Sequence, residues 1–458
     1  MDYYKITPMI VPADTEAEIK ITPLFDHAKF NPNKEKMVVL FYPWDGRFNE
    51  DKYYGYSWIP EDSENLITNW EFEQDSIVFK TYFSGEQEYN ILVLEKDDKN
   101  NIVKKRRFHL YSLNEDLYSL RPYRGNFHIH TTGSDGGEEP RYVAARYRQL
   151  GMDFCAISDH RNYNPSILAK EYWQDKNPDF KLFPGEEVHS PGNPVHIVNF
   201  GGKYSVHKFS YDNEELYRKE VAKIQETLPS NITAQSAFAI AASEWVFNKI
   251  KEADGLCVFS HPYWYTEQYV ISEEITSEIF NRRKFDAFEL LGGMYKYQPQ
   301  SNNHQVVRYY EECAKGNKFP VVGLDDSHGT DCFEVHENKV GSQTKDLAGW
   351  YSTLVFSKSC NLNDIQDSIR NGYSAAVEKI AGCQMRVYSD FRLTKYATFL
   401  MRWYFPMHDT LCENEGALML RVLSGDTKAQ EALTSLHGSV KEWEDNAFSP
   451  IKASIVIM

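Results

Sequence analysis

The chain has 458 residues, of which 42% are hydrophobic and 25% are charged. This balance is typical of folded proteins and excludes a disordered, collagen-like or disulfide-dense chain, and the length predicts two or three domains. The 50 Lys and Arg residues against 66 Asp and Glu residues give a formal net charge of −16. Such a charge repels nucleic acids and anionic membranes, so we expect neither as a stable partner. An anionic substrate would need local compensation, for which bound metal ions are the obvious candidates.

The seven cysteines are scattered, odd in number and never form a C-x-x-C pair. We therefore expect free thiols in a reducing compartment, not a disulfide framework or a thiolate zinc site. The N-terminus lacks a basic segment followed by an apolar one, and no apolar run approaches the length that spans a bilayer. These features predict a cytoplasmic location. The sequence does not predict the oligomeric state.

The first part of the chain, residues 1–120, contains short β-rich runs between turn-forming clusters. The runs are EIKITPLF, MVVLFYPW, DSIVFKTYF, YNILVLEK and RRFHLYSL. Several short strands at this spacing predict an N-terminal β-sandwich domain.

In residues 121–382, apolar strand-like runs alternate with stretches of helical periodicity. The predicted strands are FCAIS, KLFPGEEV, VHIVNF, LCVFS, FDAFELL, FPVVGLD and STLVFS. One predicted helix contains Val143, Tyr147 and Leu150 at i, i+4 and i+7 spacing. This alternation predicts an α/β fold, either a (β/α) barrel or a doubly wound sheet.

The pattern changes again in residues 383–458, which predict a small, mostly helical C-terminal appendage ending in a β-like ASIVIM run. Its aromatic segment, Trp403 to Phe405, could cover a pocket mouth or mediate oligomerisation.

Many of the 14 histidines lie beside carboxylates where predicted strands meet loops. The clusters are NFHIHTTGSDG, AISDHRN, LFPGEEVHS with PVHIVNFGG after it, VFSHPYWY and VVGLDDSHG. Residues two apart on a strand share a face, so His128 and His130 could hold one ion together. In a barrel of parallel strands the carboxyl ends lie on one face, where active sites form. The candidate metal ligands are His128, His130, Asp135, His160, Glu187, His196, His261, Asp326 and His328.

Each cluster also has a purely structural interpretation, because strand histidines are more often hydrogen-bonded structural residues than ligands. Asp159 or Asp325 could be helix N-caps, Glu186 could be a solvated charge, and His189 could hydrogen-bond to backbone. For these four residues we expect a structural or supporting role.

The ordered series HIH…SDG, SDH, G-x-E, H, SHP and D-S-H resembles the signature of the PHP (polymerase and histidinol phosphatase) superfamily. Its members adopt a distorted (β/α)7 barrel and bind two or three metal ions. The resemblance implies a first metal held by His128, His130, Glu187 and Asp326. It implies that Glu187 bridges to a second metal, whose further ligands are His196 and His261. A third position would be formed by Asp135, which some relatives replace with His, together with His160 and His328.

The domain order is similar to that of the CehA/McbA-like branch, which is named for enzymes that cleave a carbamate ester. In this chain a β-sandwich leads through RPYRGNFHIHT into the barrel. Polymerase and proofreading members are far longer, and simple histidinol phosphatases typically lack such an N-terminal domain.

The resemblance implies a metal-dependent hydrolase with two or three divalent ions, and the mixed imidazole and carboxylate ligands suit Zn, Mn or Fe. We expect a phosphoesterase for a small phosphorylated metabolite or nucleotide, using water activated by the cluster, with Glu187, Asp326 and His328 as catalytic groups. Arg161 is the best-placed cation to hold a phosphate, although a surface arginine would look the same. Tyr263 and Trp264 could form an aromatic wall for a base, or could be core residues.

Two other functions remain open. Hydrolysis of a carboxylic ester, amide or carbamate at the same metals is favoured by the branch-level resemblance. No G-x-S-x-G elbow or Cys–His signature is evident, so either reaction should use metal-activated water. The third hypothesis is a non-catalytic protein that binds a carbohydrate or a partner, with the barrel as a degenerate scaffold. Degeneracy should show as missing ligands, and none of the nine is missing.

Overall fold

A computed structural model describes residues 3–44, 66–265, 268–292, 298–330, 348–380 and 382–448. The chain forms two compact units. The first contains the described residues of Met1–Arg121, Phe399–Met407 and Ser439–Met458, and the second contains those of Pro122–Thr398 and His408–Gly438. The predicted ASIVIM strand lies outside the described residues. Among the described helices, none has the length and apolar character needed to cross a membrane.

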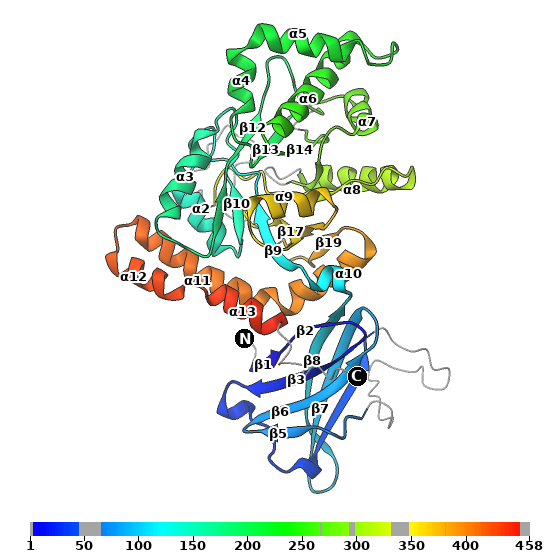
Figure 1. Cartoon of the computed structure of the whole chain (residues 1–458), viewed down its shortest axis with the longest axis vertical. Helices are drawn as coiled ribbons and strands as arrows, with labels where there is room; N and C mark the ends of the chain where they lie inside the picture. The colour runs from blue at the N-terminus through cyan, green and yellow to red at the C-terminus, as the bar shows by residue number, and fades with distance from the viewer. Residues whose placement is uncertain are drawn as a thin grey trace, which may run out of the picture. The chain divides into compact units, whose positions relative to one another are not determined.

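The first unit contains two four-stranded sheets (Figure 1). One has the order β1 (Tyr4–Thr7), β3 (Thr15–Pro23), β6 (Ser76–Phe83) and β5 (Glu71–Glu73). The other has the order β2 (Ile10–Pro12), β8 (Ile102–Leu113), β7 (Gln87–Lys96) and β4 (Met37–Pro43). Alternate apolar side chains of both sheets, such as Ile19 and Ile91, share one core, which is the packing of a β-sandwich. All five strands predicted in this part are present.

Two 3-10 turns, Asp26–Ala28 and Lys34–Lys36, lie between β3 and β4, and a short helix, α1 (Glu115–Tyr118), follows β8.

The second unit contains a six-stranded sheet and a five-stranded sheet. The larger has the order β11 (Lys181–Phe183), β10 (Phe154–Ala156), β9 (Arg121–Asn126), β17 (Tyr351–Ser357), β18 (Ser374–Glu378) and β19 (Arg386–Tyr388). The smaller has the order β12 (Gly185–Val188), β13 (Ile197–Phe200), β14 (Leu256–Phe259), β15 (Ala287–Leu291) and β16 (Val321–Gly323). Strand β13 runs antiparallel to both of its neighbours.

Two isolated parallel bridges join the sheets, one between Ile129 and Ser327 and the other between His160 and Glu187. The unit is therefore mixed α/β, while the continuous (β/α)7 barrel that the resemblance implies stays a prediction. The expected KLFPGEEV strand is divided at Pro184, because proline has no N–H to continue a ladder. Its two halves, β11 and β12, belong to different sheets.

Helices alternate with the strands of the second unit, as Figure 1 shows. They are α2 (Pro140–Gln149), α3 (Asn164–Gln174), α4 (Val206–Asp212), α5 (Glu214–Gln225), α6 (Ala234–Glu252), α7 (Glu273–Arg282), α8 (Gln298–Ala314) and α9 (Leu362–Arg370). The predicted helix corresponds to α2, which begins with Pro140 in its first turn and buries Val143 and Tyr147. Leu150 is its C-cap.

The C-terminal residues are mostly helical, as predicted, and form α10 (Phe391–Trp403), α11 (Phe405–Leu423), α12 (Thr427–Leu436) and α13 (Ser439–Phe448). They are not a unit of their own, because both compact units include parts of them. Trp403 stacks on His109 of β8, with 4.0 Å between the ring centroids, inside the first unit. The Trp403 ring therefore packs within the first unit, and the two roles suggested for the aromatic segment stay predictions.

Helix α11 is tied to the start of β10 by a buried ion pair inside the second unit. His408 Nε2 lies 2.7 Å from Asp153 Oδ1, and both side chains are buried. Burial favours the neutral imidazole, but the Asp153 carboxylate outweighs it and raises the pKa of His408 well above its usual value. Burial likewise opposes ionisation of Asp153, but His408 and Arg148 lower its pKa.

We expect His408→Asn to lower the free energy of unfolding by about 3 kcal/mol at pH 6. Because the pKa of His408 is higher in the folded than in the unfolded protein, its charged form stabilises the fold. This stabilisation is complete below about pH 6.5, the pKa of an unperturbed histidine, and is lost as the pH rises through the pKa of His408 in the folded protein. The difference between wild type and variant should therefore shrink from pH 6 to pH 9, as urea denaturation at both values would measure. A difference that stays constant would show that the pair does not ionise in this way.

Candidate metal centre

The nine predicted ligands meet at one edge of the second unit. Their donor atoms form three groups in which all atoms lie within 4.8 Å of one another: His128, His130 and Asp326; His128, Glu187 and His261; and His130, Asp135, His160 and His328. His196 joins through Glu187, with 2.8 Å between Nδ1 and Oε1. The structure thus brings all nine side chains together, and their role as ligands stays a prediction.

Glu187 is the centre of the cluster. Its Oε2 lies 2.5 Å from His160 Nδ1 and 3.5 Å from the Nε2 atoms of His128 and His130. Its Oε1 faces His196 and also lies 3.6 Å from His261 Nε2. One fully buried carboxylate therefore contacts the imidazoles of five candidate ligands, which is the arrangement expected of a bridging ligand.

Two further carboxylates, those of Asp326 and Asp135, contact other histidines of the cluster. Asp326 Oδ1 lies 2.9 Å from His130 Nε2 and 3.2 Å from His128 Nε2. Asp135 Oδ1 lies 3.2 Å from His328 Nε2. The Asp135 side chain is 47% exposed, whereas that of Asp326 is 11% exposed, so the third group is the one that opens to solvent.

His196 reaches this edge for a reason that the sequence pattern does not reveal. It precedes β13, so it lies at the amino end of its strand. Because β13 runs antiparallel to β12 and β14, that end meets the carboxyl ends of its neighbours. The expectation that every ligand follows a parallel strand is therefore wrong for His196.

Two candidate ligands have unusual backbone conformations. His261 has φ of 24° and Asp326 has φ of 50°, in a region that non-glycine residues rarely adopt. Such conformations cost about 1–3 kcal/mol each and persist where the surroundings impose them, commonly at functional sites.

The donor set fits divalent metal ions. Several buried atoms of the cluster lie close to one another but form no hydrogen bond of normal geometry among the described residues, namely His128 Nε2, His130 Nδ1, both carboxylate oxygens of Glu187, His196 Nδ1 and His328 Nε2. Leaving such atoms unpaired is costly, whereas mixed imidazole and carboxylate lone pairs suit Zn, Mn or Fe.

The pKa shifts divide the imidazoles of the cluster into two kinds. Burial opposes the charged carboxylate of Glu187, but the surrounding imidazoles lower its pKa well below the usual value. Burial and the neighbouring His328 lower the pKa of His130 to about 3, and burial lowers the pKa of His196 to about 4 despite Glu187. Burial opposes the charged form of His128, His160 and His261 as well, but the nearby carboxylates outweigh it. They raise the pKa of His128 and His261 and raise that of His160 to about 9. A metal binds an ionised carboxylate and neutral imidazoles, so its binding would release protons from these three side chains.

The four residues with expected supporting roles differ in what they do. Asp159 accepts hydrogen bonds from Thr131 and Ser134, which fixes the loop between His130 and Asp135. Asp325 accepts hydrogen bonds from the backbone N–H groups of Gly349 and Tyr351. Neither caps a helix, but both support the cluster as expected.

The other two expectations need correction. Glu186 is not solvated: it is fully buried and accepts a hydrogen bond from Val206 N–H at the start of α4. Successive residues of a strand face opposite sides, so Glu186 faces α4 while Glu187 faces the cluster. His189 belongs to the cluster, with Nε2 2.9 Å from His160 Nδ1 and 3.7 Å from Glu187 Oε2.

Glu289 of β15 is a functional residue that the sequence analysis missed. Its Oε2 lies 2.7 Å from His128 Nδ1, on the side of the ring opposite to Asp326, and it is fully buried. A carboxylate that fixes an imidazole raises its basicity toward a metal. The available signal was an acidic residue in the second half of the FDAFELL run, where its neighbours Phe288 and Leu290 are apolar.

We expect Glu289→Gln to weaken metal binding by about 10–100-fold, because the ring of His128 loses its charged partner. Competition with a chromogenic chelator would measure the change, with Glu226→Gln, which alters an exposed side chain, as control. Equal affinities of Glu289→Gln and wild type would contradict this role.

The predicted substrate contacts lie at different distances from the cluster. Arg161 is exposed, and its backbone N–H donates to the Glu187 carbonyl at 3.0 Å. The centroid of the Trp264 ring lies 5.6 Å from that of His196 and 5.7 Å from that of His261. Tyr263 differs, because its hydroxyl donates to Glu273 and accepts from Arg308. Trp264, and not Tyr263, therefore has its ring beside the cluster.

No family model and no curated protein matches the chain. The similar solved structures include a two-domain protein from Bacteroides vulgatus, assigned as containing a PHP-like metal-dependent phosphoesterase, with a TM-score of 0.35 and 16% identity over 56% of this chain and 65% of that one. They also include a protein from Bifidobacterium adolescentis assigned as a metal-dependent phosphoesterase, with a TM-score of 0.32 and 18% identity over 49% of this chain and 93% of that one.

An amidohydrolase from Chromobacterium violaceum has a TM-score of 0.31 and 15% identity over 48% of this chain and 93% of its own. The chain spans slightly less than two thirds of the Bacteroides protein. The PHP superfamily, which the ordered sequence motifs resemble, is represented among these solved structures.

Proposed function

We propose that the chain is a metal-dependent hydrolase with its centre at Glu187. The observation that carries this proposal is the buried set of unpartnered imidazole and carboxylate atoms around that residue. Divalent ions held there would supply Lewis acidity and activate water. The protein positions the donors through strand ends, and Asp159, Asp325 and Glu289 hold the surrounding groups in place.

Within this class we propose a phosphoesterase that acts on a small phosphorylated metabolite or nucleotide. One cationic side chain next to the cluster, that of Arg161, supports an anionic substrate. Arg161 follows His160 directly and is exposed, and its guanidinium can bind two phosphate oxygens at once. Its backbone N–H donates to the carbonyl of Glu187 at 3.0 Å, so Arg161 adjoins the residue at the centre of the cluster. The Trp264 ring offers a surface for a base.

Arg161→Ala is expected to lower kcat/KM for a phosphoester about 10–100-fold, mainly through KM, because a charged hydrogen bond to the substrate is lost. Metal content should stay unchanged. Steady-state kinetics would measure the effect, with Arg218→Ala on the exposed face of α5 as control. Unchanged kinetics would identify Arg161 as an ordinary surface residue.

The bond type can be tested with one leaving group. Purified protein is reconstituted separately with Mn and with Zn, and hydrolysis of 4-nitrophenyl phosphate, bis(4-nitrophenyl) phosphate, 4-nitrophenyl acetate and a 4-nitrophenyl carbamate is compared. Each assay is repeated with Glu187→Ala. Turnover of a phosphate compound alone, lost in the variant, supports the phosphoesterase. Turnover confined to the acetate or carbamate replaces it with an esterase or amidase, and no turnover of any substrate contradicts the proposal for these substrate classes.

A further inference from the structure

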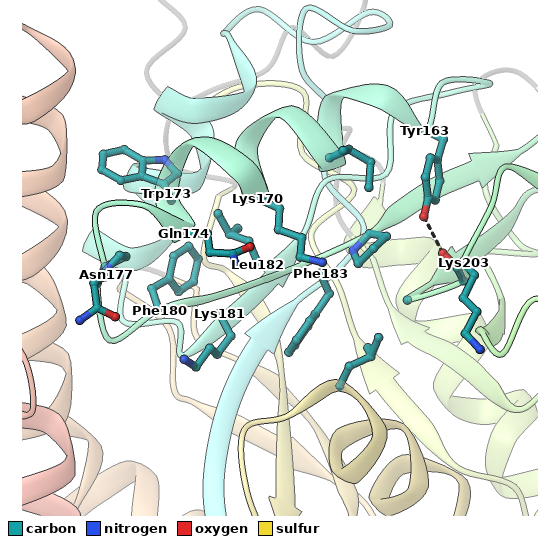
Figure 2. Close-up of a pocket in the computed structure, with 16 residues that line it drawn as sticks. Tyr163, Lys170, Trp173, Gln174, Asn177, Phe180, Lys181, Leu182, Phe183 and Lys203 are labelled. Atoms are coloured by element: carbon teal, nitrogen blue, oxygen red, sulfur yellow. Dashed lines mark hydrogen bonds between the residues drawn. The ribbon is translucent and has the colours of Figure 1, made fainter.

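A cavity of about 680 Å³ lies along β11, and none of its lining residues belongs to the metal cluster (Figure 2). The parallel strands β10 and β11 start near it, and β10 leads away from it toward His160. The reversed strand β13 ends at it, since Gly201 to Lys203 belong to its wall. None of the nine candidate ligands lines this cavity.

The cavity occupies the place where the two sheets of the second unit separate. Strand β11 is the edge of one sheet and β12 is the edge of the other. They are consecutive in the chain, with Pro184 between them, and Pro184 lines the cavity. Helix α3 forms the outer wall through Ile167, Lys170 and Trp173. The space is thus a feature of the fold and not a gap between surface side chains.

The charge of the lining is opposite to that of the chain. Three lysines line the cavity, Lys170, Lys181 and Lys203, and none of its lining residues is Asp or Glu, although the net charge of the chain is −16. Lys203 is paired with Asp254. Lys170 and Lys181 form no ion pair within the part of the chain that the structure describes. Figure 2 shows Lys170 extending from α3 toward the strand that carries Phe183.

The remaining lining is mostly apolar and aromatic. Phe180, Leu182 and Phe183 form its floor and are themselves buried, and Trp173 stands at one end. Gln174 and Asn177 add neutral polar groups. The volume lies within the range of about 300–1,000 Å³ that is typical of small-molecule sites, which combine an apolar lining with a few polar groups.

We propose that this cavity binds a small organic anion, namely a carboxylate, sulfonate or phosphate group carried on an aromatic or aliphatic body. Lys170 and Lys181 attract the anionic group from different sides of the cavity, and Phe180 and Phe183 contact the body. The site is separate from the metal cluster, so binding does not require the metals or the proposed hydrolase activity.

The test uses 1-anilinonaphthalene-8-sulfonate, an aromatic sulfonate, with the full-length protein and isothermal titration calorimetry. We expect one site whose affinity falls about tenfold or more in Lys170→Gln/Lys181→Gln and at raised salt. The control Lys208→Gln/Lys223→Gln, at exposed positions of α4 and α5, should bind as wild type does. Binding should also survive treatment with a chelator. Absence of binding, or equal affinity of the double variant and wild type, would overturn the proposal.

A second variant tests the cavity itself. Ile167→Trp fills the space from α3 and should abolish binding while the circular dichroism spectrum and metal content stay those of wild type. The neutral compound 1-anilinonaphthalene should bind at least about tenfold more weakly than the sulfonate. If the filled variant still binds the sulfonate, or if the neutral compound binds equally well, the probe recognises another apolar surface and the proposal fails.

Discussion

Glu187→Gln is expected to remove most of the bound metal and to lower turnover on the order of 10³-fold, which corresponds to about 4 kcal/mol of lost transition-state stabilisation. The substitution keeps the size of the side chain but removes the charge that faces the imidazoles of five candidate ligands. Without that charge the cluster would hold several cationic or electron-poor groups together in a buried space, and a bridging carboxylate has no substitute among the described neighbours. Metal analysis and kinetics on the same preparation would measure both effects.

Glu186→Gln is the matched control, since it changes the neighbouring carboxylate in the same way. Glu186 faces α4, and a glutamine there can still accept the hydrogen bond from Val206 N–H. We expect a modest loss of stability with metal content and turnover close to wild type. Equal loss of metal in both variants would show that general destabilisation, and not the position of Glu187, causes the effect.

The sequence was sufficient to find the cluster because its members are tied to local patterns. His128 and His130 stand on one face of an extended segment, and Asp326 and His328 repeat that spacing. Asp326 and His328 follow the apolar strand β16, and His128 and His130 follow β9, which pairs in parallel with β10. The five strands of the sandwich were visible for the same reason, since short-range alternation and turns determine them.

Other features depend on contacts that no local pattern encodes. The position of His196 depends on the reversal of β13, and the direction of a strand is set by its partners. Glu289 and His128 are 161 residues apart in the sequence. Glu186 and Glu187 are chemically identical neighbours. Only the packing of α4 against β12 shows that Glu186 accepts a hydrogen bond from the start of α4, whereas Glu187 is the candidate ligand.

The C-terminal helices show the same limit on a larger scale. Residues 383–458 have a helical pattern that predicts the helices correctly. The pattern does not reveal that a buried ion pair joins His408 of α11 to Asp153 at the start of β10, the strand that precedes His160. Arg148 of α2 bonds to Glu415 of α11 across 267 residues of sequence. Burial opposes the charge of Arg148, but Cys412, Glu415 and Asp153 raise its pKa further, so it stays cationic.

Glu415→Ala is expected to lower the free energy of unfolding by about 4 kcal/mol, because it leaves a fully buried guanidinium without its main partner. The same substitution removes the acceptor of the Asp179 backbone N–H, which lies 2.6 Å from Glu415 Oε1. Urea denaturation followed by circular dichroism would measure the loss.

The control is Glu214→Ala, which breaks an exposed pair with Arg218 in the next turn of α5. Exposed pairs of this kind contribute about 0.3–0.5 kcal/mol, so the two variants should differ by about 3 kcal/mol or more. Replacing both partners, as in Arg148→Met/Glu415→Leu, should recover most of the stability, because no buried charge is then left unpaired. If the single and double variants are equally unstable, packing and not the buried ion pair joins α11 to α2.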